Sequence, residues 1–212
     1  MKLLKLFFVF TIICFTSQYA YSNIIATKDP KDYANKLGNK IIELVEAKIS
    51  NEEKQKKLIE LFRANADTTY MANFAIGKFN RLLTKEQKTR YQNLYSDYVV
   101  YTYIPRFREY EGERQNVLTA LDLGQGEFLI KTTITSVKAK NGKVSVDYKV
   151  KRAGNSFKVF DVIGEGVSLI TTHRADFTAP ISQKGVDFFL DRLEEKVKKQ
   201  KAVKWDSIKK KK

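Results

Sequence analysis

The hydrophobic pattern of this chain changes its period near Gly112, and that change constrains the fold class. Up to this point, apolar residues recur at the spacing of one helix face. Beyond it they alternate with polar residues, most strictly over residues 143–151, as in a strand with one solvated face. Helical spacing returns from Gly185 to about Gln200. The pattern predicts an α+β fold with N-terminal helices, a curved antiparallel sheet of about four strands and a closing C-terminal helix.

Capping residues mark where the first helices begin and end. The pair Asp29-Pro30 opens a helix whose apolar stripe runs to about Ile49. The stripe consists of Tyr33, Leu37, Ile41, Leu44 and Val45. Ser50 begins a capping box for a second helix. A short third helix over residues 68–76 is predicted to end at Gly77.

The longest predicted helix spans about residues 85–110 and opens with a capping box at Thr84. Pro105 should kink or split it, because proline cannot donate the helical hydrogen bond. Six of the eleven tyrosines fall on it: Tyr91, Tyr95, Tyr98, Tyr101, Tyr103 and Tyr110. Tyrosine combines an apolar body with a polar tip, so this helix suits either ordinary core or the wall of a wet-ended pocket.

Turn residues divide the second half of the chain into strands. Residues 115–122 form the first predicted strand. The hairpin signal Asn141-Gly142 pairs residues 128–137 with the alternating strand that follows. Gly154-Asn155 then turns the chain into a strand that starts at Phe157.

In this last strand, the side chains on both faces are apolar. They are Phe157, Val159 and Ile163 on one face and Phe160 and Val162 on the other. We expect it to be covered on both sides, either by plain core or by a pocket. Gly164 and Gly166 should bend or end it.

The first 22 residues have the pattern of a secretory signal peptide. Lys2 and Lys5 precede an apolar run over residues 6–15, and small residues at Ala20 and Ser22 suit a cleavage site. The run is too short to span a bilayer, and a retained membrane anchor is the alternative. Cleavage would remove the only cysteine, so the mature chain could form no disulfide.

We therefore expect a signal peptide over residues 1–22 and a single α+β domain over residues 23–200. The helical part of this domain covers about residues 30–111, and the sheet part covers about residues 115–200. A basic tail forms residues 201–212.

The chain carries a formal charge of +15, and nine lysines lie between Lys196 and Lys212. Such a run is either a solvated tail or a segment attracted to an anionic membrane surface or an acidic partner. A basic chain rich in tyrosine also fits nucleic-acid binding. The signal peptide argues against nucleic acid, because the exported compartment holds little of it.

The sequence lacks the residue sets that the common hydrolytic and metal-dependent enzymes need. His173 is the only histidine, and no cysteine follows the signal peptide, which excludes a multi-histidine or cysteine zinc site. No Gly-x-Ser-x-Gly elbow presents a nucleophile, and neither Gly-x-Gly pair continues as a phosphate-binding loop. We expect no catalytic residue, no metal site and no enzymatic activity.

Two motifs carry a resemblance to a known family. Asp161-Val162, residues 165–169 with the sequence Glu-Gly-Val-Ser-Leu, and Arg174 form the first. Asp67 followed by residues 71–77 forms the second. Together they resemble the MlaC family, the soluble periplasmic phospholipid carriers of Gram-negative bacteria, and the resemblance covers roughly residues 30–200.

The resemblance implies a carrier that holds a phospholipid by its acyl chains and shuttles it between the outer and inner membranes, which supports outer-membrane lipid asymmetry. The phospholipid would be cargo, with no other cofactor. The implied partners are an inner-membrane ABC transporter complex, an outer-membrane lipoprotein–porin complex and, transiently, membrane surfaces. We expect a periplasmic monomer. The alternative is a periplasmic binding or adaptor protein whose apolar interior is only core.

The implied pocket lies between the concave face of the sheet and the helices. Our candidate tail contacts are Phe74, Ile76, Tyr95, Tyr98, Val99, Ile130, Ile134, Tyr148, Phe160, Val162, Val167 and Leu169. Asp161, Glu165 and Arg174 match the family motif, and we expect them to support the structure or the pocket mouth.

Overall fold

The computed structural model describes residues 23–136 and 141–203. The predicted signal peptide and residues 204–212 of the predicted basic tail lie outside the described residues. Within the described ranges, no helix is long and apolar enough to cross a membrane.

The first half of the chain is helical, as the spacing of its apolar residues predicts. The elements are α1 (Pro30–Glu46), α2 (Asn51–Asn65), α3 (Thr68–Ile76), the 3₁₀ helix η1 (Gly77–Leu82), α4 (Lys85–Tyr103) and the 3₁₀ helix η2 (Ile104–Glu109). The expected split at Pro105 is confirmed, because α4 gives way to η2 there.

The predicted caps are also confirmed. The Asp29 carboxylate accepts hydrogen bonds from the backbone N–H groups of Lys31 and Asp32. Thr84 and Gln87 form a reciprocal capping box at the start of α4. These bonds satisfy backbone donors that the first turn of a helix would otherwise leave unpaired.

The second half forms one antiparallel sheet in which each strand pairs with the next along the chain. The strands are β1 (Arg114–Gly124), β2 (Glu127–Thr135), β3 (Lys143–Ala153), β4 (Ser156–Gly164) and β5 (Val167–Ser168). The prediction of about four strands holds for the long ones, and the two-residue β5 adds a fifth.

The closing helix differs most from its prediction. It was expected from Gly185, but α5 runs over Leu169–Ala202, so Leu169 begins a helix and does not extend the sheet. Ser168 caps it by accepting a hydrogen bond from the backbone N–H of Thr171. The apolar face of its first half has helical spacing: Ile170, His173, Phe177 and Ile181 are all buried. Gly185, with φ of 83°, interrupts the helix where the prediction had it start.

A β-bulge in β4 corrects the predicted faces of that strand. Val159 pairs with Val150 and Val162 pairs with Tyr148, which leaves Phe160 as the extra residue. Val162 therefore faces the same side as Phe157 and Val159, and the predicted grouping of Val162 with Phe160 is wrong. A strict period of two cannot reveal a bulge.

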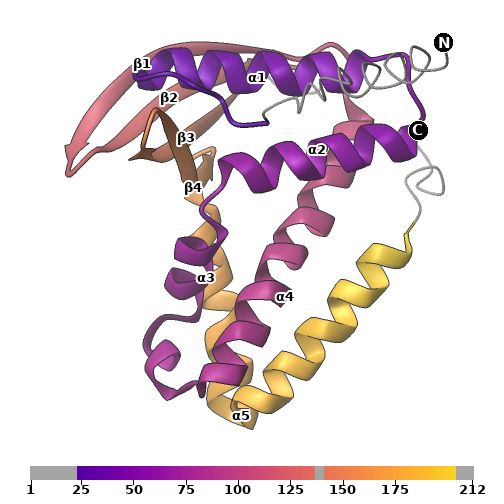
Figure 1. Ribbon diagram of the computed structural model, residues 1–212, viewed down its shortest axis with the longest axis vertical. Helices are drawn as coiled ribbons and strands as arrows, with labels where there is room; N and C mark the ends of the chain where they lie inside the picture. Colours follow the sequence, from indigo (N-terminus) through magenta and orange to yellow (C-terminus); the bar gives the residue numbers. More distant parts are fainter. Residues whose placement is uncertain (1–22, 137–140, 204–212) are drawn as a thin grey trace, which may run out of the picture.

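The buried side chains form three clusters along the molecule. One joins α1 to the inner face of the sheet, around Tyr33, Ile130 and Phe157. A second joins α1, α2 and the end of α4. The third, which we call the helical core, joins α3, η1, α4 and α5. Figure 1 shows α1 lying along the sheet at one end, with α3, α4 and α5 extending away from it.

Candidate functional site

An apolar pocket with a cavity volume of about 30 Å³ lies between α1 and the inner face of the sheet. It is lined by Tyr33, Ala34, Leu37, Gly38, Ile41, Gln115, Ile130, Tyr148, Val150 and Val159. Strand alternation places the sheet residues on one face, and the helical stripe supplies the opposite wall. The pocket is thus a gap between two elements that otherwise pack together.

Gly38 brings α1 close to β1 at the edge of this pocket. A Cβ at this position would lie 3.0 Å from the side chain of Gln115, which is tighter than ordinary packing. Gln115 itself donates from Nε2 to the carbonyl of Ala34, with 3.0 Å between the two atoms. Its Oε1 accepts from the hydroxyl of Tyr148 at 3.0 Å. Gln115 therefore links the helix to the sheet across the pocket.

The polar groups beside the pocket are neutral. Burial raises the pKa of Tyr148 to about 12, and burial also raises the pKa of Tyr33. The Tyr33 hydroxyl donates to the carbonyl of Asn65 at 3.2 Å. Walls of this kind suit an apolar ligand, since they carry no charge that would have to be desolvated.

Two of the predicted contacts, Ile130 and Tyr148, line the pocket. Two more share the inner face of the sheet: Ile134 pairs with Gln115 across the ladder, and Val162 pairs with Tyr148. Phe160 is buried in the bulge, and its ring centroid lies 5.0 Å from that of Tyr70.

The other predicted contacts lie away from this pocket. The helical core contains Ile76, Tyr95, Tyr98 and Val99 as buried members, with Phe74 and Leu169 packed against it. Val167 is 63% exposed in the short β5. The prediction assigned one cavity to all the apolar faces, whereas the structure divides them among separate clusters.

The sequence prediction missed the wall that α1 provides. Tyr33, Leu37 and Ile41 belong to a stripe that the spacing identifies, but nothing in the spacing says which element it faces. Gly38 was the available signal, because a glycine inside a helix often marks a close approach of another backbone or side chain.

The buried aromatic cluster on α4 packs around His173. The Tyr95 hydroxyl lies 3.0 Å from Nδ1 of His173, and the Tyr103 hydroxyl lies 3.3 Å from Nε2. The Phe177 ring is stacked on the imidazole, with 5.8 Å between centroids. Burial lowers the pKa of His173 to about 4, so the ring is neutral near pH 7. The tyrosines of α4 therefore serve here as hydrogen-bonded core.

The motif residues join elements to one another. The buried carboxylate of Asp161 accepts from Ser168 Oγ at 2.8 Å and from the N–H of Ile170 at 3.3 Å, at the start of α5. Glu165, with φ of 49°, accepts a hydrogen bond from the N–H of Ser145. Arg174 donates from Nε to the carbonyl of Phe74 at 2.8 Å, and its guanidinium carbon lies 3.8 Å from the centre of the Phe74 ring. The motif residues thus hold both the sheet and helix α3 against helix α5.

Within residues 23–136 and 141–203, no group of three or more His, Cys, Asp or Glu side chains could hold a metal ion.

Comparison with known proteins agrees with this architecture. The curated "Intermembrane phospholipid transport system binding protein MlaC" of Haemophilus influenzae is 19% identical over 205 residues, which cover 92% of this chain and 95% of that protein. A phospholipid-binding protein from Ralstonia solanacearum, solved in complex with a phospholipid, has a TM-score of 0.66 at 21% identity. That match covers 81% of this chain and 96% of the other, and it shows a common fold.

The family model described as MlaC protein matches residues 32–195, which span α1, the whole sheet and most of α5. Both motif regions that carry the resemblance, around Met71 and around Asp161, lie within this match. The chain belongs to the MlaC family.

Proposed function

We propose that this protein binds a phospholipid by its acyl chains and carries it through the periplasm between the inner and outer membranes, in support of outer-membrane lipid asymmetry. The observation that carries the proposal is the apolar pocket between α1 and the sheet, in a fold shared with a protein solved in complex with a phospholipid. Family membership and the name of the Haemophilus relative support the same function.

The hydrophobic effect explains why such a lipid needs a carrier. Each methylene group left in water costs about 0.8 kcal/mol. Two acyl chains with roughly 30 methylenes would therefore cost on the order of 24 kcal/mol. A carrier must cover these chains, whereas the polar headgroup can stay in water.

The pocket must widen to hold this cargo. A site for two acyl chains needs at least about 1,000 Å³, the upper end of ordinary ligand pockets. The pocket between α1 and the sheet has a cavity volume of about 30 Å³. Because its two walls belong to different elements, separating α1 from the sheet enlarges it without breaking either element. The hydrogen bond from Gln115 to the carbonyl of Ala34 is a polar tie between the sheet and α1 that this movement must loosen.

An inner-membrane ABC transporter complex and an outer-membrane lipoprotein–porin complex are the partners that family membership supports. A monomer is sufficient for the proposed cargo, because both pocket walls come from one chain.

A periplasmic binding or adaptor protein without lipid cargo is the second candidate. The small present volume of the pocket favours it. Under this candidate, α1 and the sheet stay packed together at all times.

Transfer of a fluorescent phospholipid between donor and acceptor vesicles tests the proposed function. The purified protein should raise the transfer rate in proportion to its concentration, and vesicles alone should exchange slowly. A rate that does not depend on the protein would support the adaptor function.

A further inference from the structure

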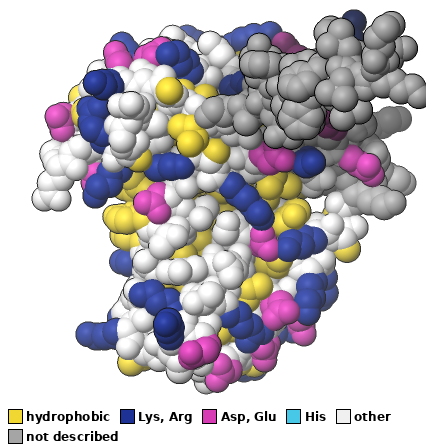
Figure 2. Space-filling view, in the orientation of Figure 1, with side chains coloured by type: hydrophobic (Ala, Val, Ile, Leu, Met, Phe, Trp, Pro, Cys, Tyr) yellow, Lys and Arg dark blue, Asp and Glu magenta, His cyan; other side chains and the backbone are white. Residues whose placement is uncertain are grey.

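One end of the molecule concentrates positive charge beside exposed apolar side chains. It is formed by η1, the start of α4 and the bend of α5, and Figure 1 shows it opposite α1 and the sheet. Between residues 77 and 88 the cations are Lys78, Arg81, Lys85 and Lys88, and the one carboxylate is Glu86. We call residues 77–88 with Lys184 and Phe188 the basic tip. Figure 2 shows Lys and Arg side chains gathered at the lower left, where Figure 1 places η1.

The apolar part of the basic tip faces solvent. Leu82, the last residue of η1, is 65% exposed, and Phe188 is 38% exposed. The Nζ of Lys184 lies 4.7 Å from the centre of the Phe188 ring. A single exposed leucine is ordinary in a soluble protein. Here it directly follows Arg81 in a short turn that carries further cations, which is the composition of a membrane-interface segment.

The cations of the basic tip are not neutralised by neighbours. Among the residues that the structure describes, no salt bridge involves Lys78, Arg81, Lys85, Lys88 or Lys184. The nearby acids on α5 already have partners: Asp187 accepts from Gln87, while Asp191 and Glu194 both pair with Arg90. Arg90 therefore partly compensates the charges of Asp191 and Glu194, while Asp187, bonded to the neutral Gln87, keeps its charge beside the basic tip.

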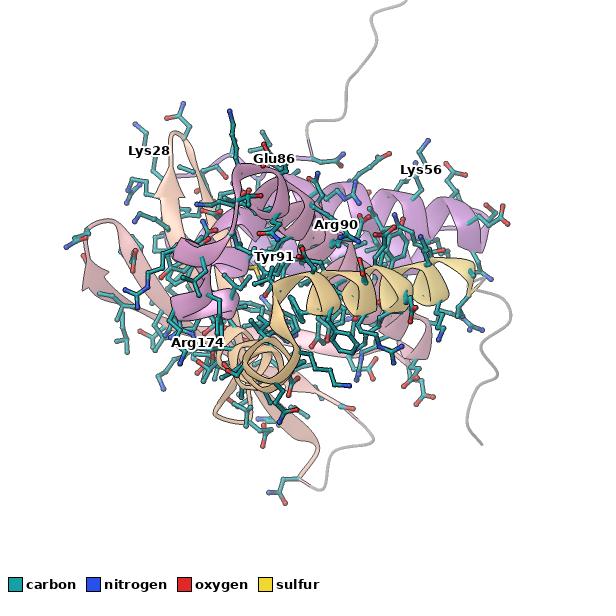
Figure 3. The ribbon with its side chains drawn as sticks, turned by 90° about the horizontal axis from the view of Figure 1, so that it is seen from below. Lys28, Lys56, Glu86, Arg90, Tyr91 and Arg174 are labelled. Carbon is teal, nitrogen blue, oxygen red and sulfur yellow. The ribbon has the colours of Figure 1, made fainter. Side chains whose placement is uncertain are left out.

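An open groove between α3, η1 and α5 adds one more cation beside the basic tip. Lys78 and Arg174 both line it. The contacts of Arg174 with Phe74 hold its guanidinium in place, so it contributes a fixed positive charge. Figure 3 views the molecule from this end, with Arg174 and Glu86 labelled.

We propose that the basic tip binds the surface of an anionic phospholipid bilayer, with Leu82 entering the interface. Each basic residue near such a surface is attracted to it, and an apolar side chain among them gains by leaving water. A bilayer places an apolar region directly beneath its anionic headgroups, so it receives Leu82 and the surrounding cations together without a preformed pocket. Binding to an acidic protein is the alternative that the vesicle test separates. The basic tip is separate from the pocket, so this binding goes beyond the carrier function and does not require cargo.

Sedimentation with vesicles tests the proposal through two matched triple variants. The tip triple reverses the charge of three side chains of the basic tip through Lys78→Glu, Arg81→Glu and Lys85→Glu. The control triple makes the same change of net charge on exposed lysines of α1, α2 and the loop between them. It carries Lys31→Glu, Lys48→Glu and Lys56→Glu. The probes are vesicles of phosphatidylcholine alone and of equal parts phosphatidylcholine and phosphatidylglycerol.

We expect the wild-type protein to bind the anionic vesicles more tightly than the zwitterionic ones, and increasingly so at lower salt. The tip triple should lose at least roughly a hundredfold in affinity, because removing each cation costs about fivefold and each new glutamate adds repulsion. The control triple should lose much less. Thermal unfolding of both triples should match the wild type, since all six side chains are exposed.

A fluorescence variant tests the role of Leu82 separately. Leu82→Trp in a Trp205→Phe background places the only tryptophan on the basic tip. Its emission should shift to the blue with anionic vesicles and stay unchanged with phosphatidylcholine alone. Equal vesicle binding by the two triples, or an emission that anionic vesicles leave unchanged, overturns the proposal. The amount of co-purified lipid reports on the pocket and should be the same in both triples, so the two proposals can fail separately.

Discussion

His173 shows how one buried side chain links packing to pH. It is 1% exposed and forms hydrogen bonds with two tyrosine hydroxyls. Burial lowers its pKa to about 4 from a usual value of 6.5. Asp176 raises this pKa and Lys196 lowers it, each less than burial does. Between these two pKa values the unfolded chain binds a proton that the folded chain does not. The contribution of His173 to stability is therefore present above about pH 6.5 and is lost as the pH falls towards about 4.

Replacing His173 should make the free energy of unfolding fall less steeply as the pH is lowered below neutrality. We expect His173→Gln to be less stable than the wild type at about pH 7, because it disturbs two buried hydrogen bonds. Between about pH 6.5 and about pH 4, the wild type should lose on the order of 3 kcal/mol that the variant does not lose. Urea unfolding at several pH values measures this difference. Parallel curves for the two proteins would contradict a neutral buried His173.

A second test at the scale of single residues distinguishes a residue of the pocket wall from an exposed residue. Ile41 lines the pocket from α1 and is half-buried, whereas Val167 is 63% exposed and away from it. Ile41→Trp should fill the pocket and remove co-purifying lipid. The free energy of unfolding of the lipid-free variant should fall by about 1–3 kcal/mol. Val167→Trp is the matched control, and it should change neither lipid content nor stability. Phosphorus assay of the purified proteins measures the lipid. Full lipid content in Ile41→Trp would place the cargo elsewhere.

At the scale of elements, local sequence signals predicted most of the fold. Caps at Asp29 and Thr84 act within a few residues, so the sequence alone locates them. The start of α5 was missed because Gly185 looks like a boundary, while the true cap is Ser168. The bulge at Phe160 was missed because it depends on the register with β3. The pocket wall on α1 depends on tertiary packing, which spacing does not encode.

A reversible crosslink between α1 and β1 tests whether the pocket opens by separating these elements. A Cβ at position 38 would lie 3.0 Å from the end of the Gln115 side chain, so positions 38 and 115 face each other. Gly38→Cys with Gln115→Cys, in the chain from Asn23 onward, is the pair to oxidise, and loss of both free thiols verifies the disulfide. The oxidised protein should not take up phospholipid, and reduction should restore uptake. Gly38→Cys alone is the control. Equal uptake by the oxidised and reduced forms would show that the cargo enters without this movement.

At the scale of the whole molecule, the apolar pocket proposed for the cargo and the basic tip lie at opposite ends. The pocket lies between α1 and the sheet, and the basic tip lies where η1 meets α4 and the bend of α5. The helical core joins the two ends through α3, α4 and α5. Under the two proposals, the protein would hold its lipid at one end and meet a membrane with the other. The sequence predicted the class of this fold, but the separation of the two ends follows only from the way the helices pack.

Native mass spectrometry of the protein, purified without detergent, tests the central claim most directly. We predict a species heavier than the mature chain by the mass of one phospholipid, present in the wild type and in Val167→Trp. Ile41→Trp should show the protein mass alone. A wild-type spectrum with only the protein mass, together with no phospholipid in a solvent extract of the same sample, would contradict the carrier function and support an adaptor without cargo.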